Sequence, residues 1–70
     1  MPETCAVAVE LAEKEARLVE PLGVCVDERR GRMFVADFGA DAVVGVNLFS
    51  GAVTRWEGAV GVRTVRCLEE

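Results

Sequence analysis

The sequence predicts a mainly β fold, in which one four-stranded antiparallel meander follows an amphipathic helix. Three observations support this prediction. Short apolar segments recur along the middle of the chain, turn-forming residues separate them, and a longer segment with helical periodicity precedes them. The helix is predicted at residues 4–20, and the strands at residues 22–27, 32–37, 42–48 and 52–57.

The predicted helix has one polar face and one apolar face. Its polar face carries Glu10, Glu13, Lys14 and Arg17. Its apolar stripe carries Cys5, Ala8, Val9, Ala12, Ala16 and Val19. We expect Pro21 to end the helix, because proline disfavours helical backbone at the residue before it. A strand that begins at residues 6–9 is the alternative prediction for this part of the chain.

The predicted strands carry apolar side chains on both faces. Residues 32–37 place Met33 and Val35 on one face and Phe34 and Ala36 on the other. A sheet with one solvated face would alternate apolar with polar residues. The helix can cover one face only. The uncovered face is therefore expected to bind a protein partner, a second copy of the chain, or sequence beyond these residues.

Residues 1–70 are predicted to form a single small domain, in which residues 58–70 are an edge strand or a frayed tail. The net charge is −4, all of it in residues 1–27, so the chain as a whole lacks the basic field of a nucleic-acid-binding protein. No apolar run approaches the length needed to span a bilayer, and we expect no membrane association.

The chain has three cysteines, Cys5, Cys25 and Cys67, and no histidine. No Ser–His or Cys–His nucleophile pair can form, so no catalytic residue is predicted. We expect reduced, buried thiols in a cytoplasmic protein, because the cysteines are odd in number and widely spaced. A Cys5–Cys67 or Cys25–Cys67 disulfide is the alternative. A redox role for Cys25 has the weakest support.

Residues 21–51 contain a run of short motifs in a fixed order. Pro21 is followed by Gly-Val-Cys-Val-Asp, a glycine turn, Phe-Val-Ala-Asp, a Gly-Ala-Asp turn, a valine-rich segment and Ser-Gly. This run resembles a blade of an NHL-repeat β-propeller, and the YWTD and gluconolactonase-like propellers are similar. The positions that carry the resemblance are Gly23, Asp27, Gly31, Asp37, Gly39 and Gly51.

The resemblance implies a sheet packed between neighbouring blades, and a propeller contains typically four to eight of them. This chain has one recognisable blade, covering about residues 21–57, and its predicted helix lies outside the family's pattern. Three explanations follow. The chain is a fragment of a larger propeller, a split blade that completes another subunit, or a free-standing domain with a local likeness.

The expected function is that of a non-catalytic scaffold or protein-interaction module without a cofactor. One alternative, implied by the resemblance, is a fragment of a gluconolactonase- or paraoxonase-like metal-dependent hydrolase. Its candidate metal ligands are Asp27, Asp37 and Asp41, with Asn47 behind them, although carboxylates at strand ends more often cap turns.

A second alternative is an RNA-binding surface of the NHL type. The basic side chains that could form it are Arg29, Arg30, Arg32, Arg55, Arg63 and Arg66. Phe34 and Trp56 could stack on bases, although a core position is the simpler prediction for both. The acidic helix and the neutral remainder of the chain argue against this alternative.

Overall fold

The computed structural model describes residues 3–66, with the side chains of residues 9–66. Its elements are helix α1 (Glu3–Ala16), strand β1 (Pro21–Asp27), strand β2 (Arg32–Asp37), the 3-10 helix η1 (Phe38–Ala40), strand β3 (Ala42–Asn47) and strand β4 (Val53–Glu57). The predicted fold class, a mainly β domain with one N-terminal helix and a four-stranded antiparallel sheet, is confirmed.

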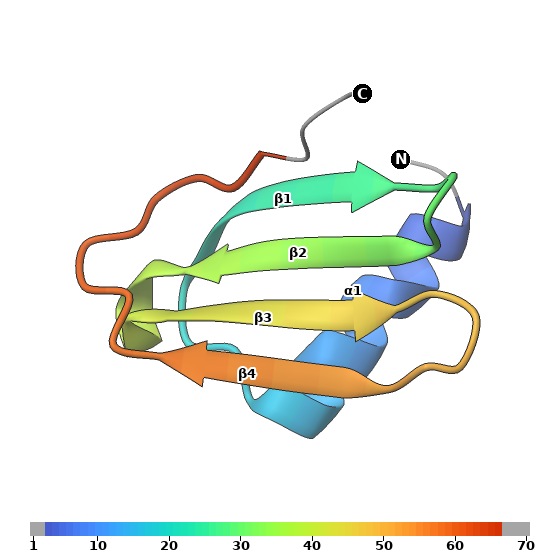
Figure 1. Ribbon diagram of the computed structural model, residues 1–70. Coiled ribbons are helices and arrows are strands. Elements are labelled where there is room, and N and C mark those ends of the chain that lie inside the picture. The colour runs from blue at the N-terminus through green and yellow to red at the C-terminus, as the bar shows by residue number, and fades with distance from the viewer. Residues whose placement is uncertain (1–2, 67–70) are drawn as a thin grey trace.

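The sheet has the order β1-β2-β3-β4, so each strand pairs with the next strand of the chain (Figure 1). All three pairings are antiparallel. Helix α1 crosses one face of the sheet, as Figure 1 shows. The pairing places Val24, Val35 and Val44 side by side on that face, because directly paired residues of antiparallel strands point the same way.

The core lies between α1 and the sheet. Its buried residues are Ala12 and Ala16 of α1 with Met33, Val35, Val44 and Val46 of β2 and β3. Small alanines allow the helix to approach the strands closely, and each large apolar side chain buried here contributes about 1.5–3 kcal/mol. The helix packs on β3 and β4, so Val24 in β1 stays 43% exposed on the same face.

Helix α1 ends at Ala16, four residues before the predicted end at residue 20, and Pro21 begins β1 rather than stopping the helix. Arg17 takes a left-handed conformation with φ 53°, and its N–H donates to the Glu13 carbonyl at 3.1 Å. This is the αL helix cap, which normally uses glycine. The Arg55 guanidinium donates to the Ala16 carbonyl at 2.7 Å and satisfies the exposed helix end.

The segment between α1 and β1 is fixed by Asp37, which is fully buried. Its carboxylate accepts the backbone N–H of Val19 at 3.1 Å and that of Glu20 at 2.9 Å. The Phe38 N–H in turn donates to the Glu20 carbonyl at 3.0 Å. Val19 was expected in the apolar helix stripe but lies outside the helix, and it is 67% exposed. The expected stripe residues Cys5 and Ala8 lie outside the described side chains.

The strand boundaries agree with the predicted ones to within one residue. Strand β3 ends at Asn47 and β4 begins at Val53, because the Asn47 carboxamide oxygen accepts the N–H groups of Phe49 and Ser50 and turns the chain. Gly51 completes this turn with φ 78°. In β1, the pairing with β2 shifts between Pro21 and Gly23.

Residues 58–66 form no strand, and after β4 they pass the end of the sheet and run beside β1 (Figure 1). Asp41 anchors their beginning. Its carbonyl accepts the N–H of Ala59 at 2.9 Å, and its carboxylate accepts the N–H of Gly61 at 3.2 Å. Farther along, this segment lies against Gly23, where a Cβ atom would come within 2.8 Å of the Arg63 carbonyl oxygen. Residues 67–70, also included in the predicted tail, lie outside the described residues.

Candidate functional site

The sheet has a second face, opposite α1, which we call the helix-free face. Strand pairing and the alternation of side chains define its members. Its central members are Gly23, Cys25, Phe34, Ala36, Val43, Gly45, Thr54 and Trp56, and these are apolar or uncharged. The same alternation places the polar residues Asp27, Arg32 and Asn47 at the end of this face beside the β1–β2 turn. The expectation of two apolar faces therefore describes this sheet, and the helix-free face is the candidate functional site.

An aromatic pair forms the centre of the helix-free face. The rings of Phe34 and Trp56 have centroids 6.2 Å apart and are tilted by 39°. Both rings lie over Gly45, where a Cβ atom would be 2.8 Å from the Trp56 ring and 3.3 Å from the Phe34 ring. Gly45 thus lets the two rings meet above the backbone of β3. Trp56 remains 50% exposed.

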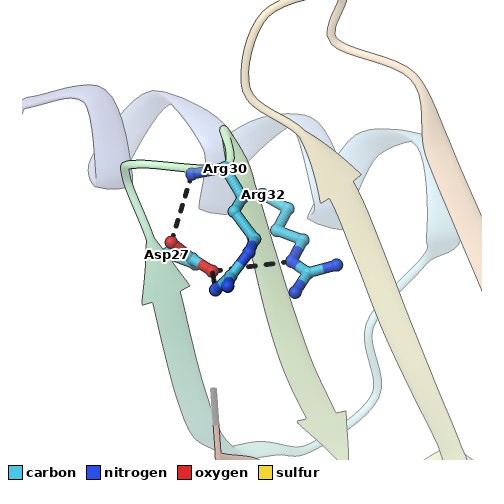
Figure 2. A network of polar contacts seen from close by, with 3 residues as sticks. All are labelled: Asp27, Arg30 and Arg32. Carbon is cyan, nitrogen blue, oxygen red and sulfur yellow. Dashed lines mark hydrogen bonds and ion pairs between the residues drawn. The ribbon is translucent and has the colours of Figure 1, made fainter. Parts of the chain in front are cut away.

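A charged cluster, formed by Asp27, Arg30 and Arg32, lies at the β1–β2 turn (Figure 2). Asp27 Oδ2 is 3.0 Å from Arg30 Nη1 and 3.7 Å from Arg32 Nε, and Asp27 Oδ1 accepts the Arg30 N–H at 3.2 Å. The Arg32 guanidinium also lies 5.7 Å from the centroid of the Phe34 ring. The cluster therefore joins the turn to the aromatic pair.

The pKa of Asp27 is lowered from its ordinary value. The main cause is the hydrogen bond from the Arg30 side chain, followed by the bond from the Arg30 backbone N–H. The positive charges of Arg30 and Arg32 add to the effect, while burial opposes it. Asp27 is thus held ionised by its neighbours, which suits a structural ion pair rather than a proton donor.

The C-terminal segment covers the opposite border of the helix-free face. The Arg63 guanidinium lies 4.6 Å from the centroid of the Phe38 ring, and Thr64 approaches Gly23. Ala36, which pairs with Gly23, is fully buried. The β1 side of this face is therefore partly covered, and the β3–β4 side, which carries Trp56, is open.

Cys25 lies on the helix-free face, is nearly buried, and is disulfide-bonded. The expectation of reduced thiols is therefore wrong for this residue. The odd number and wide spacing of the cysteines favoured reduced thiols, but neither observation excludes a bond that uses two of the three. The only other cysteines are Cys5 and Cys67, whose side chains lie outside the described ones.

The three candidate metal ligands do not come together. Asp27 ends β1, whereas Asp37 ends the antiparallel β2 at the other end of the sheet. Asp41 follows η1, and its carboxylate is bonded to the Gly61 N–H. Among the described residues, no group of three or more acidic, cysteine or histidine side chains could hold a metal ion. Asn47 caps the β3–β4 turn instead.

The arginines considered for RNA binding do not share one face. Arg55 pairs with Val44 on the helix side, where it bonds to the Ala16 carbonyl and to Glu57. Arg30 and Arg32 are paired with Asp27, and Arg63 lies over Phe38. Arg29 is exposed in the β1–β2 turn, and Arg66 ends the described part of the chain. The positive charges are therefore dispersed around the sheet.

The motif glycines serve the backbone in different ways. Gly31 has φ 64°, and the Phe49 ring occupies the position of its missing Cβ. At Gly39, a Cβ atom would come within 2.8 Å of Val19 and Glu20 side-chain atoms. Both glycines therefore permit close packing at turns, which explains these motif positions without a ligand.

Sequence reasoning placed Phe34 and Trp56 in the core and so missed the centre of this site. The available signal was the alternation in residues 32–37 and 52–57, which places both aromatic residues opposite the helix. Comparison of the chain with protein-family models, with curated proteins and with solved structures found no match. In the described part of the chain, no helix has the length and apolar character to cross a membrane.

Proposed function

We propose that this chain is a non-catalytic protein-interaction module, and that its helix-free face binds the same face of a second copy. The observation that carries the proposal is the Phe34–Trp56 pair over Gly45. An indole that is 50% exposed on a flat apolar face resembles the aromatic anchors at the centres of protein interfaces. A second sheet would remove this ring from water.

A second copy is the partner that the arrangement favours. Two identical faces have the same twist, so their strands can align when the sheets stack. A two-fold axis would pair the helix-free face of one chain with the helix-free face of the other, so the assembly would contain two chains and grow no further through this face. Helix α1 already packs against β3 and β4 on the other face, so a second sheet cannot stack there. Such a dimer would give the sheet two covered faces, as the propeller-blade resemblance implies for a blade.

Support for a module without catalysis comes from the carboxylates. Asp27, Asp37 and Asp41 each accept a hydrogen bond from backbone N–H groups of the chain itself. Carboxylates engaged in this way stabilise turns and segment ends. For the same reason we do not extend the proposal to metal-dependent hydrolysis, and the dispersed arginines do not favour RNA.

The cellular compartment of this chain, which the sequence analysis expected to be the cytoplasm, is also a proposal. A cytoplasmic location was expected from reduced thiols, and the disulfide at Cys25 removes that support, because cytoplasmic thiols are normally kept reduced. A cytoplasmic protein would carry this bond only transiently. Rapid alkylation of lysed cells, followed by mass analysis of the peptide that contains Cys25, measures the reduced fraction directly.

The experiment for the proposed function is sedimentation equilibrium over a range of protein concentrations. We expect the wild-type chain to form a dimer and Trp56→Glu to be a monomer with an unchanged far-ultraviolet circular dichroism spectrum. Phe49→Glu is the matched control, because Phe49 is also an exposed aromatic residue but lies in the β3–β4 turn. A wild-type chain that stays monomeric at every concentration would contradict the proposal.

A further inference from the structure

We infer that β4 forms a second interface, at which the outer edge of this strand pairs antiparallel with β4 of a second copy. The inference goes beyond the proposed function, because stacking of the helix-free faces leaves the edges of both sheets uncovered. In the order β1-β2-β3-β4, β4 has a neighbouring strand on one side only. Figure 1 shows β4 as the outermost strand, with α1 in the layer behind the sheet.

The hydrogen bonds of the β3–β4 hairpin establish which backbone groups of β4 point outward. The Asn47 N–H donates to the Ala52 carbonyl at 2.8 Å, so these two residues form a hydrogen-bonded pair. Bonded and non-bonded pairs alternate along antiparallel strands, so Thr54 and Trp56 are the residues that bond to β3. The N–H and carbonyl groups of the residues between and beside them point away from the sheet. These residues are Val53, Arg55 and Glu57.

The outward backbone groups of β4 are open to another strand. In the part of the chain that the structure describes, no turn, loop or side-chain hydrogen bond engages them. The edge at β1 differs, because residues 58–66 run beside it (Figure 1). A row of N–H and carbonyl groups at a sheet edge is a template for pairing with another chain. The β4 edge is therefore the one available for pairing.

The charges of β4 favour a second copy as the added strand. Arg55 and Glu57 lie on the helix side of the strand, and Trp56 lies between them on the helix-free face. When β4 pairs with itself about a two-fold axis at Trp56, Arg55 lies opposite Glu57 of the partner subunit. The symmetry forms this ion pair twice. Opposite charges that face each other across two strands stabilise a sheet, so the strand is complementary to itself.

The same register brings two indoles together. Trp56 lies opposite Trp56 of the partner subunit in a non-hydrogen-bonded pair, in which side chains are closer than in a bonded pair. Aromatic cross-strand pairs are stabilising, and the Trp56 side chain is half exposed and available for one. A register centred on Arg55 would instead place two like charges opposite each other. A register centred on Thr54 would place Arg55 opposite Val53 and form no ion pair.

Edge pairing is compatible with the proposed stacking of helix-free faces. A two-fold axis perpendicular to the sheet keeps both helix-free faces on the same side, so the two chains share one continuous sheet. Two such sheets can stack through this face and give an assembly of four chains. At the edge, only Arg55 and Glu57 contribute backbone bonds to the partner strand. We therefore expect edge pairing to be weaker than face stacking, so that the face-to-face dimer forms first.

Amide hydrogen exchange, measured by NMR at increasing concentrations of the wild-type chain, tests the edge directly. We expect exchange at Arg55 and Glu57 to slow at least about tenfold, because their N–H groups become bonded to the partner strand. Thr54 and Trp56 are the internal controls, since their N–H groups bond to β3 in every state of assembly. Val53 should not slow, because it lies beyond the paired stretch.

The exchange pattern separates the edge from its register. Exchange at Arg55 and Glu57 that stays equally fast at every concentration would overturn edge pairing, whether or not the chain dimerises through its face. Slowing at Val53 equal to that at Arg55 would overturn the register centred on Trp56.

Charge variants test the register independently. Glu57→Arg places two arginines opposite each other, and Arg55→Glu places two glutamates opposite each other. We expect neither variant to slow exchange at position 55 alone, and an equimolar mixture to restore the slowing, because every cross-strand pair then has opposite charges. Glu10→Arg, the same charge change at an exposed position of α1, should behave as wild type. A mixture that behaves as its components do would contradict the assigned ion pairs.

Arg55→Glu also removes the hydrogen bond to the Ala16 carbonyl, so its fold is checked by circular dichroism. Glu57→Arg keeps that bond and tests the repulsion by itself. If Glu57→Arg slowed exchange at Arg55 as strongly as wild type does, charge would not select the edge.

Sedimentation separates failure of the edge from failure of the face. Phe34→Glu changes the centre of the helix-free face on β2 and should leave edge-paired assemblies of two chains. Glu57→Arg should leave the face-to-face dimer and form no assembly of four chains. If exchange at Arg55 slows but the wild-type chain never exceeds two chains, the edge is supported and the proposed function is contradicted.

Discussion

At the scale of single residues, three aspartates that end predicted strands or turns have three separate structural tasks. Asp27 binds the arginines of its own turn, Asp37 binds the segment that precedes β1, and Asp41 binds the returning C-terminal segment. The sequence predicted turn capping for such carboxylates, and this is correct for Asp27. It could not reveal the partners of Asp37 and Asp41, because those N–H groups are distant in the chain.

Asp27 provides a prediction about pH. Its pKa is lowered in the folded chain relative to about 3.9 in an unfolded one, so its contribution to stability is complete above about pH 4–5. That contribution is lost as the pH falls through the lowered folded pKa. We therefore expect Asp27→Asn to have a lower melting temperature than wild type at pH 7, and the difference to shrink below about pH 4. Thermal melts between pH 2 and 7 measure this.

The matched control for that series is Glu57→Gln, because Glu57 forms the exposed ion pair with Arg55 on the other side of the sheet. Exposed pairs of this kind contribute little, so its difference from wild type should stay small. A difference between Asp27→Asn and wild type that persists unchanged at low pH would show that the charge of Asp27 is not responsible.

At the scale of elements, the strands were predictable because local chemistry determines their ends. Gly31, Asn47 and Gly51 mark turns that the chain can form without distant contacts. The end of α1 was not predictable in the same way. Arg17 is a good helix former, yet it takes a left-handed conformation, because Arg55 and Asp37 engage the backbone on either side of it.

The centre of the candidate site was missed for a related reason. Phe34 and Trp56 lie on strands that are not neighbours, and they meet only because the β2–β3 and β3–β4 registers place Gly45 between them. Each sequence segment alone indicates an aromatic residue in a strand. The contact depends on two registers and on one missing side chain, which local periodicity does not report.

The connection between helix and sheet provides the second prediction. Asp37→Ala leaves the N–H groups of Val19 and Glu20 without their acceptor, and we expect a loss of about 2–3 kcal/mol in the free energy of unfolding. Asp37→Asn should lose less, since its carboxamide oxygen can still accept. Urea denaturation measures both variants.

Asp41→Asn is the control for these variants, because asparagine also tolerates the left-handed conformation that Asp41 adopts. It should stay within about 0.5 kcal/mol of wild type, as surface substitutions usually do. If Asp37→Ala were as stable as Asp41→Asn, the Asp37 hydrogen bonds would not be what fixes the segment after α1.

At the scale of the whole molecule, the domain depends on a small core. Met33 is one of the few large side chains that are fully buried, and it lies between α1 and the sheet. We expect Met33→Ala to lower the free energy of unfolding by about 2–5 kcal/mol. Small domains have about 5–15 kcal/mol in total, so this single change should approach global unfolding.

Val60→Ala is the comparison for the core variant, because Val60 is 83% exposed in the C-terminal segment. Calorimetry should show a melting temperature close to wild type for Val60→Ala and a much lower one for Met33→Ala. Equal melting temperatures would mean that the chain is not stabilised by the core between α1 and the sheet.

The order β1-β2-β3-β4 has a consequence for how the chain folds. Each strand can close a hairpin with the strand before it, so the sheet assembles through contacts of low sequence separation, and chains with such contacts fold fast. The helix contributes its contacts to β3 and β4 only after those hairpins exist. We therefore expect sheet formation to be the early kinetic event and the docking of α1 to follow it, with Asp37 joining the two.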